Sequence, residues 1–460
     1  MEDTEEFLET ILRQDFPSFI GKVFSTINPG AKYHANWHID LIAEYLEGVR
    51  LGQIKRLIIN MPPRALKSVC VSVAWPAWLL SLNPGTRIMV ASYSSILSIK
   101  HSMDTRLVVS SSWYKKLFPK TKLSESHNQK SKFLTTKNGF RFATSVGGSA
   151  TGEGGDFLII DDPHNPTQIN SLKMRNRVIE WFEQTFITRL NDKKNGAIVL
   201  VMQRLHQEDL SAHLQSSNGW EVLKIPALAP KDIEYNFGKF HKIYKEGEIL
   251  DNIRDTQDFL QNLEREIGSR NYAAQFLQEP LAANYHLLSP NNIHYFEKLP
   301  GKFDFFVHSW DTAIKTSETS DYTVGTMWGI LQNKYYLVQM IRKKLIYSDK
   351  QIHKYKPRFV LIEDKASGQS LIQDLKISGF NNIKSIKPSL DKITRFASVT
   401  HLFESGTVLL PAQAAFSRII TSEITNFPNG KHDDIVDSIS QFLNFVKQQN
   451  GNNFVQIRSL

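Results

Sequence analysis

The chain has 460 residues, of which 41% are hydrophobic and 22% charged, a composition typical of globular proteins. This length exceeds one ordinary hydrophobic core, so we expect two domains and a small connector. The net charge of +9 and the pI of about 9.2 favour a polyanionic partner. Cys70 is the only cysteine, which excludes internal disulfides and cysteine-rich zinc sites and fits a reducing cytoplasm.

The sequence indicates neither a leader peptide nor a membrane segment. Residues 1–6 are acidic where a signal peptide would be basic, and no apolar stretch follows them. The most apolar segment, residues 69–82, is interrupted by Ser72 and Pro76 and falls short of the roughly 20 apolar residues that a bilayer requires. We therefore expect a cytoplasmic protein.

Amphipathic helices are predicted near the N-terminus, over residues 7–24 and 38–46. Strand-like apolar runs then alternate with segments of helix length, and these runs cover residues 56–60, 87–91, 157–160 and 197–202. Such alternation predicts an α/β domain over residues 1–230, with a mostly parallel sheet and helices on both faces.

The second half of the chain starts with a polar segment. Residues 231–300 carry no strong strand run, which predicts a helical connector. Strand-like runs then return over residues 305–308, 323–330, 335–340 and 358–362. Three strands with hairpin-like spacing, a helix and a further strand are compatible with a ribonuclease-H-like α/β domain over residues 301–446. Residues 447–460 are rich in Gln and Asn and are expected to form a flexible tail.

A phosphate-binding loop is indicated after the first strand. Such a loop presents backbone N–H groups, a lysine for the β and γ phosphates and a hydroxyl for magnesium. Lys67 and Ser68 stand in this order at the end of the loop. Met61 and Leu66 occupy the two positions at which the G-x-x-x-x-G-K-[ST] pattern has glycine, and Leu66 adds a side chain where phosphate should approach closely.

A second acidic motif supports a nucleotide site. The apolar run 157–160 ends in Asp161 and Asp162, of which the first could hold magnesium and the second could orient the attacking water. Either motif alone is better explained by ordinary α/β structure. The two motifs in this order within one sheet favour a P-loop-type nucleotide site.

The second domain places acidic residues at two strand ends. Asp311 ends its first strand and Glu363 ends a later one, an arrangement suited to a nuclease that holds two divalent ions. Because side chains alternate along a strand, Glu363 and Asp364 cannot both face the metals with equal ease.

A third acidic position lies at the start of the last long helix, where Asp433, Asp434 and Asp437 cluster. Acids in a first helical turn also complement the helix dipole without any metal. The sequence leaves open which of the three would be a metal ligand. Asp321 and His432 are weaker candidates, and residues 342–344 and 384–395 supply basic side chains that could contact phosphates.

Taken together, these motifs resemble the large terminase subunit of tailed bacteriophages, including prophage copies, over nearly the whole chain. The motifs that carry the resemblance are Trp37-His38, Pro62-Pro63-Arg64, Lys67-Ser68, Ala91-Ser92-Tyr93-Ser94, Thr151-Gly152, Ile160-Asp161-Asp162-Pro163, Gln203-Arg204, Asp311-Thr312-Ala313, Glu363-Asp364 with Gly368, and His432-Asp433-Asp434. The resemblance implies a packaging ATPase in the N-terminal domain and a ribonuclease-H-like nuclease in the C-terminal domain that cuts concatemeric DNA.

The resemblance also implies roles for single residues. Lys67 and Ser68 would bind phosphate and magnesium, and Arg64 would sense the γ-phosphate. Asp161 would hold magnesium, and Asp162 stands where many relatives have the catalytic glutamate. Three further residues correspond to the adenine contact and to the motif that couples hydrolysis to movement: Trp37, His38 and Gln203. The match of Glu363 and Gly368 to the family pattern favours Glu363 over Asp364 as a metal ligand.

The implied cofactors are ATP and Mg²⁺, with Mn²⁺ as an alternative in the nuclease site. The implied partners are double-stranded DNA, a small terminase subunit and the portal of the procapsid, on which the subunits would form a ring in the bacterial host cell. Two alternatives remain: a ribonuclease-H-like transposase or resolvase, and a prophage remnant that binds DNA without turning over ATP.

Overall fold

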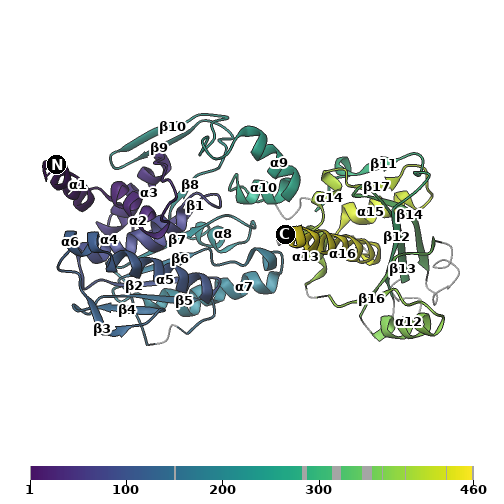
Figure 1. Cartoon of the computed structure of the whole chain (residues 1–460), viewed down its shortest axis with the longest axis horizontal. Helices are drawn as coiled ribbons and strands as arrows, with labels where there is room; N and C mark the ends of the chain where they lie inside the picture. The colour runs from purple at the N-terminus through teal and green to yellow at the C-terminus, as the bar shows by residue number, and fades with distance from the viewer. Residues whose placement is uncertain are drawn as a thin grey trace. The chain divides into compact units, whose positions relative to one another are not determined.

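The structure is a computed structural model that describes residues 2–149, 152–281, 287–312, 323–343, 355–364, 366–388, 390–430 and 432–457. The chain divides into two compact units, each with its own sheet (Figure 1). The first comprises Met1–Gln261 and Arg270–Leu281, and the second comprises Asn262–Ser269 and Ala282–Leu460. Within the described residues, no helix is long and apolar enough to cross a membrane.

The main sheet of the first unit has the strand order β3-β4-β5-β2-β6-β7-β1-β8. Its strands are β1 Arg56–Asn60, β2 Arg87–Ser92, β3 Leu123–Asn128, β4 Lys132–Thr135, β5 Phe140–Ser145, β6 Phe157–Asp161, β7 Ala197–Met202 and β8 Glu221–Lys224. The strands from β5 to β8 in this order are parallel, whereas β3 and β4 pair antiparallel at one edge. Every residue of β7 is buried, as expected for a central strand covered on both faces.

Helices cover both faces of this sheet, as the sequence predicts. They are α1 Glu2–Gln14, α2 Phe16–Ile27, α3 Trp37–Arg50, α4 Trp75–Leu82, α5 Ser95–Ser110, α6 Ser112–Leu117, α7 Leu172–Trp181 and α8 Leu210–Gln215. Single turns of other helix types lie between them: η1 Val69–Ala74, η2 Pro166–Gln168, η3 Phe182–Phe186 and η4 Ile187–Arg189. The core that includes Leu57 and Ile59 packs against α2 to α5, and the core that includes Ile58 packs against α7 and α8.

The helix predicted over residues 7–24 is in fact two helices. Asp15 lies between α1 and α2, and its Oδ2 accepts a hydrogen bond of 2.8 Å from the backbone N–H of Ser18. Pro17 stands in the first turn of α2, where its missing N–H is tolerated. An N-cap followed by proline therefore starts a new helix at this point.

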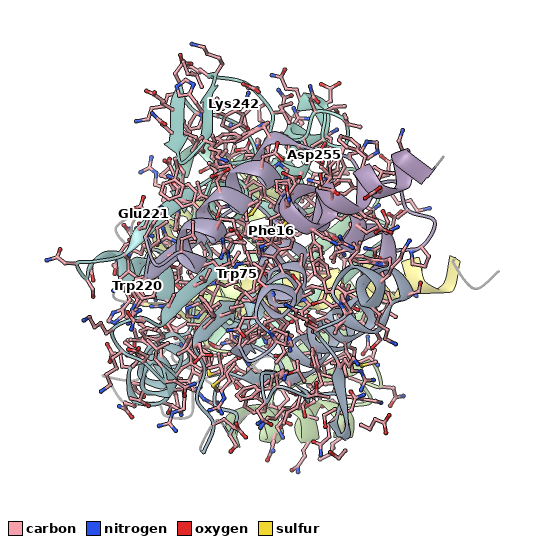
Figure 2. The ribbon with its side chains drawn as sticks, turned by 90° about the vertical axis from the view of Figure 1, so that its left-hand side faces the viewer. Phe16, Trp75, Trp220, Glu221, Lys242 and Asp255 are labelled. Carbon is pink, nitrogen blue, oxygen red and sulfur yellow. The ribbon has the colours of Figure 1, made fainter. Side chains whose placement is uncertain are left out.

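The prediction of a helical connector over residues 231–300 is wrong in part. The segment does contain α9 Gln257–Ile267 and α10 Ser269–Gln275, but β9 Ile233–Phe237 and β10 Phe240–Tyr244 form an antiparallel hairpin, which carries Lys242 (Figure 2). Gly238 opens its two-residue loop with φ +59°, a conformation that suits the twist of a tight hairpin. The first unit thus extends beyond residue 230.

The sheet of the second unit has the strand order β11-β17-β14-β13-β12-β15-β16. Its strands are β11 His294–Phe296, β12 Phe305–Asp311, β13 Thr323–Leu331, β14 Lys334–Lys343, β15 Phe359–Glu363, β16 Ile383–Ile386 and β17 Val408–Pro411. β12, β13 and β14 are antiparallel neighbours, and β15 returns parallel to β12. These are the three strands and the further strand that the sequence predicts. The helix expected between β14 and β15 falls largely on residues 344–354, which lie outside the described residues.

Two helices of this unit cover opposite faces of its sheet. These two are α12 Ala366–Ile377 and α16 Asp434–Ile457. The unit also contains α13 Lys392–Ala397, α14 His401–Glu404 and α15 Ser417–Asn426, and η5 Pro290–Asn292 precedes β11. α16 packs on the face of Trp328, whose ring stacks on Phe442 with centroids 4.5 Å apart. Leu371 and Leu375 of α12 pack on the other face with Ile362.

The prediction of a flexible tail from residue 447 is corrected by α16, which continues to Ile457. Polar composition suggested fraying, but the side chain of Lys447 donates a hydrogen bond of 3.0 Å to the carbonyl of Ser398. This contact ties the helix to the segment after α13.

Candidate functional site

The two motifs of the predicted nucleotide site meet at one edge of the first sheet. β1 and β6 both run parallel to β7, which lies between them, so their carboxyl ends point the same way. The loop after β1 carries Lys67 and Ser68, and β6 ends at Asp161. Loops at the carboxyl ends of parallel strands are the usual place for a ligand in an open α/β sheet.

Two direct contacts link the loop to the acids. The ammonium of Lys67 lies 3.1 Å from Oδ2 of Asp162, and the hydroxyl of Ser68 donates a hydrogen bond of 2.9 Å to Oδ1 of Asp161. Burial raises the pKa of both carboxyl groups, while the Lys67 charge opposes this shift. The four residues that the sequence predicts to hold phosphate, magnesium and water are therefore in contact with one another.

The loop has the backbone of a glycine-containing loop although glycine is absent. Arg64 has φ +63° and Leu66 has φ +62°, both in the left-handed region that non-glycine residues rarely adopt. For L-residues this conformation costs roughly 1–2 kcal/mol each. Leu66 thus takes the conformation expected of the glycine that it replaces, and its side chain packs partly against the core.

Asp162 connects the acidic motif to the next strand. Its Oδ1 accepts a hydrogen bond of 3.0 Å from the backbone N–H of Gln203, just after β7. Its own backbone lies in the left-handed region with φ +44°, and its carbonyl accepts a hydrogen bond from the N–H of Tyr93. This hydrogen bond links Asp162 to the residue that follows β7, so the backbone of Gln203 lies next to the acids.

Trp37 and His38 begin α3. The Trp37 ring packs among the aromatic rings of Tyr235, Phe240 and Tyr244 on or beside the hairpin. His38 is buried, and burial lowers its pKa to about 4. The positive charge of Arg254 also lowers the pKa of His38. The guanidinium of Arg254 donates a hydrogen bond to the carbonyl of Arg64 in the loop after β1. The residues predicted to contact adenine thus lie near the phosphate-binding loop.

Two buried residues at this site escaped the sequence analysis. His101 of α5 has its Nδ1 3.4 Å from Oδ2 of Asp161, and Arg141 of β5 is fully buried. Burial lowers the pKa of His101 to about 4 and that of Arg141 to about 9. A signal existed in the sequence, because α5 carries polar residues at helical spacing that the structure buries.

The acids of the second unit meet across its central strands. β12 and β15 pair in parallel, with Trp310 opposite Ile362, so the next residues, Asp311 and Glu363, lie side by side at the strand ends. The structure therefore brings together two acids that are 52 positions apart in the chain.

α16 covers the face on which these two acids lie. The hydroxyl of Ser309 donates a hydrogen bond of 2.7 Å to the carbonyl of Ser438 in α16, and Leu361 belongs to the core that α16 shares. Side chains two residues apart on a strand point to the same face. Asp311 and Glu363, two residues after Ser309 and Leu361, consequently point to the side of α16. Asp364 lies past the end of β15 and accepts a hydrogen bond from Gln369.

Asp434, the first residue of α16, approaches the same row of residues. Asp311 pairs with Val324, and Val324 pairs with Arg342 on β14. The guanidinium of Arg342 lies 3.8 Å from Oδ2 of Asp434 and 3.4 Å from Oε2 of Glu423. Glu423 also accepts a hydrogen bond of 2.7 Å from the backbone N–H of Ile435, so it caps the helix that carries Asp434.

The other two acids of this cluster are bound by cations of α13. Asp437 lies 2.7 Å from both Lys392 and Arg395, and Asp433 lies 2.8 Å from Lys392. Burial raises the pKa of Asp437, whereas its ion pairs act against that shift. Asp437 is almost fully buried, which suits a structural ion pair.

Asp311, Glu363 and Asp434 offer the oxygen ligands that Mg²⁺ and Mn²⁺ prefer. Among the residues that the structure describes, however, no three His, Cys, Asp or Glu side chains already form a group that could hold an ion. The donor set fits a hard divalent cation, and Arg342 stands beside Asp434 as its counter-charge. Asp321 lies outside the described residues, and His432 precedes α16.

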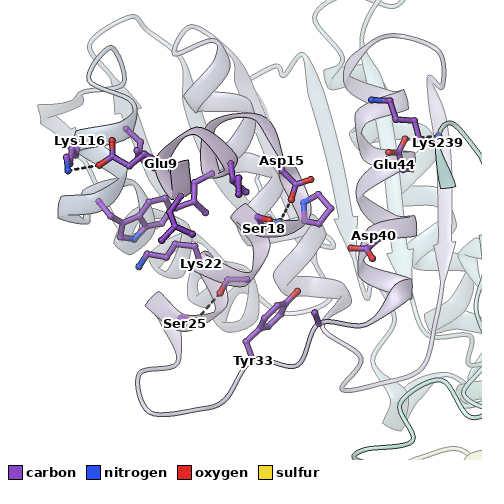
Figure 3. A pocket seen from close by; sticks show the side chains of 18 of the residues that line it. Glu9, Asp15, Ser18, Lys22, Ser25, Tyr33, Asp40, Glu44, Lys116 and Lys239 are labelled. Atoms are coloured by element: carbon purple, nitrogen blue, oxygen red, sulfur yellow. Dashed lines mark hydrogen bonds and ion pairs between the residues drawn. The ribbon is translucent and has the colours of Figure 1, made fainter. Parts of the chain in front are cut away.

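A large pocket of the first unit lies elsewhere. Its volume is about 950 Å³, and it is lined by residues of α1, α2 and α6 together with the start of α3 and the hairpin (Figure 3). None of the predicted site residues lines it. Glu9 and Lys116 pair across one wall at 2.5 Å.

Comparison with known proteins finds a family match within the second unit. Residues 308–445 match the family described as the terminase RNaseH-like domain. Asp311, Glu363 and the acids of α16 all lie within the matched residues.

Solved structures extend the likeness to the whole chain. Three are structures of the large terminase of the thermophilic bacteriophage D6E, each 12% identical to this chain and covered to 98% of its own length. Crystal form 2 has a TM-score of 0.52 and covers 88% of this chain; the complexes with ATP-γ-S and with ADP each have a TM-score of 0.50 and cover 88% and 94%. No curated protein matches the sequence. These matches confirm the expected resemblance to large terminases and the expected fold class, an α/β unit followed by a second α/β unit that resembles the terminase RNaseH-like domain.

Proposed function

We propose that this chain is the large subunit of a phage DNA-packaging motor. It hydrolyses ATP to move double-stranded DNA into a procapsid, and it cuts concatemeric DNA with a metal-dependent endonuclease. The observation that carries the proposal is the presence of both sites in one chain: an assembled Lys67, Ser68, Asp161 and Asp162 site, and a terminase RNaseH-like domain whose strands end in Asp311 and Glu363. A similar large terminase, that of phage D6E, was solved in complex with ATP-γ-S.

In the ATPase site, the contacts support the following roles. Lys67 would leave Asp162 to bind the β and γ phosphates, and Arg64 would sense the γ-phosphate from the same loop. Ser68 and Asp161 would hold a magnesium ion, which would neutralise charge on the phosphates. Asp162, freed from Lys67, would orient the attacking water. The hydrogen bond between Asp162 and the N–H of Gln203 would transmit its displacement to the end of β7. Trp37 and His38 would contact the adenine.

In the nuclease site, Asp311, Glu363 and Asp434 are the proposed metal ligands. Asp433 and Asp437 are weaker candidates because Lys392 and Arg395 bind them, and Asp364 is weaker because it lies past the strand end. Two divalent ions held by these acids would activate water and stabilise the leaving oxygen. Arg342 balances the charge of Asp434 in the metal-free protein and is displaced when the ion binds. The working assembly is a ring on the portal, with a small terminase subunit as partner.

ATP hydrolysis by the purified protein, measured with and without double-stranded DNA, tests this proposal against its rivals. A packaging motor subunit hydrolyses ATP, and DNA changes its rate; the same preparation linearises plasmid when Mg²⁺ or Mn²⁺ is present. A ribonuclease-H-like transposase or resolvase would cut or join DNA without hydrolysing ATP. A prophage remnant would bind DNA and hydrolyse nothing. Either of these results contradicts the proposed function.

A further inference from the structure

The buried face of α5 is polar along its first three turns and becomes apolar only at Val108 and Val109. The side chains at helical spacing that point inward are Ser98, His101, Ser102 and Thr105, each at most 6% exposed. Burying a polar group costs free energy unless it finds a partner, so a stripe of this kind needs an explanation. α5 packs against β2, β5 and η1, the elements around the nucleotide site.

His101 lies next to Asp161, the proposed magnesium ligand. Its Nδ1 lies 3.4 Å from Oδ2 of Asp161, a close approach slightly too long or too bent to be a hydrogen bond, and both atoms are buried. The other carboxylate oxygen, Oδ1, accepts a hydrogen bond from Ser68. The two oxygens of Asp161 therefore have separate neighbours: the imidazole on one and the phosphate-loop hydroxyl on the other.

A buried positive charge also lies near the carboxylate of Asp161. Arg141 is fully buried, and its guanidinium donates hydrogen bonds to the carbonyls of Ser98 and Ser72 at 3.5 and 3.3 Å. Its charge favours the ionised form of Asp161. Arg141 is thus held by backbone carbonyls and acts on Asp161 through space. The imidazole of His101 lies close enough to orient the carboxylate, together with the hydroxyl of Ser72, which also acts on Asp161.

We propose that His101 is a positioning residue for nucleotide-bound magnesium: its Nδ1–H holds Oδ2 of Asp161, so that Oδ1 faces Ser68 and the ion. The proposal rests on the proposed ATPase function. A second-layer hydrogen bond that orients a metal ligand commonly changes metal affinity by 10- to 100-fold. His101 contributes in this way without touching ATP.

The test measures how strongly Mg²⁺ enhances nucleotide binding in the full-length protein. Calorimetry gives the Kd for ATP-γ-S in Mg²⁺ and in EDTA for the parent, for His101→Phe, which keeps a flat ring and removes the N–H, and for His101→Gln, which restores a donor. In His101→Phe we expect the Kd in Mg²⁺ to rise about 10-fold with the Kd in EDTA unchanged. His101→Gln should recover most of the enhancement.

Thr105→Val is the matched control, because it removes a buried hydroxyl from the same stripe one turn along α5, where the hydroxyl contacts the carbonyl of His101 and not Asp161. It should keep the full effect of Mg²⁺. The proposal is overturned if His101→Phe keeps the parental enhancement, or if it weakens binding equally in Mg²⁺ and EDTA. A parent protein that binds no ATP-γ-S in either condition would instead refute the ATPase function, and the proposal with it.

Discussion

Leu66 lies where a phosphate-binding loop has glycine, and its φ of +62° is the conformation that glycine adopts without cost. Leu66→Gly should relieve about 1 kcal/mol of backbone strain and let phosphate approach the loop backbone more closely. We expect ATP turnover to rise severalfold. The check is steady-state ATPase activity, with Ala65→Gly as the control that loosens the same loop at a position without positive φ. A fall in turnover with Leu66→Gly alone would mean that the loop has adapted to leucine.

Glu363 and Asp364 are adjacent acids with different surroundings. Glu363 ends β15 beside Asp311 and is 2% exposed, whereas Asp364 follows the strand and accepts a hydrogen bond from Gln369. Glu363→Gln should nearly eliminate Mg²⁺- or Mn²⁺-dependent plasmid cleavage, because the amide cannot supply the charge that holds the cations. Asp364→Asn should reduce cleavage only mildly. Both variants should melt near the parental temperature, and equal loss of cleavage in the two would contradict the assignment of Glu363.

At the scale of elements, α16 separates two acids that the sequence could not distinguish. Asp434 faces Arg342 at 3.8 Å, while Asp437 lies within 2.7 Å of both Lys392 and Arg395 of α13. Asp437→Asn should therefore destabilise the protein by about 3 kcal/mol, because it leaves the largely buried guanidinium of Arg395 without its acid. Asp434→Asn should instead abolish cleavage and change the melting temperature little.

Thermal melting and plasmid cleavage of these two variants, measured side by side, give the answer. If Asp437→Asn melts like the parent and fails to cut, Asp437 is a metal ligand and the structural role assigned to its ion pairs is wrong.

Strand ends were predictable from the sequence because apolar runs stop at acids. Asp161, Asp311 and Glu363 all end or follow such runs, and the structure places them at the ends of β6, β12 and β15. Their spatial neighbours were not predictable. Glu363 lies beside Asp311 only because β15 returns next to β12 after two intervening strands, and no local pattern specifies that pairing.

Two elements show what local patterns miss. The strands of the β9–β10 hairpin mix apolar and aromatic residues with polar ones, so they form no clear apolar run. The one sequence feature that could have predicted the hairpin is Gly238 in its two-residue loop. α5 has the reverse of the usual pattern: it exposes Ile96 and Leu107 and buries His101. A search for apolar faces would orient this helix the wrong way round, so the neighbour of Asp161 could be found only in three dimensions.

At the scale of the whole molecule, buried histidines couple stability to pH. Burial lowers the pKa of His308 from 6.5 to about 4. Between these values the unfolded chain binds a proton that the folded chain does not, so stability falls as pH drops from 6.5 towards 4. Between pH 7 and pH 5 the parent should lose about 2 kcal/mol more stability than His308→Gln. Urea unfolding at the two pH values measures this difference, and His294→Gln, an exposed site in the same unit, should leave it unchanged. A His308→Gln variant with the parental pH dependence would show that His308 is not buried neutral.

We propose that one chain holds two chemically independent sites, an ATPase site in its first unit and a nuclease site in its second. The most direct test is a crossed comparison of Lys67→Ala and Asp311→Asn, with ATP hydrolysis and metal-dependent plasmid cleavage measured on the same folded preparations. Lys67→Ala should abolish hydrolysis and keep bulk cleavage, because the lysine serves only the phosphates. Asp311→Asn should abolish cleavage and keep hydrolysis. Loss of both activities in either folded variant, or cleavage by Asp311→Asn at the parental rate, would contradict the account.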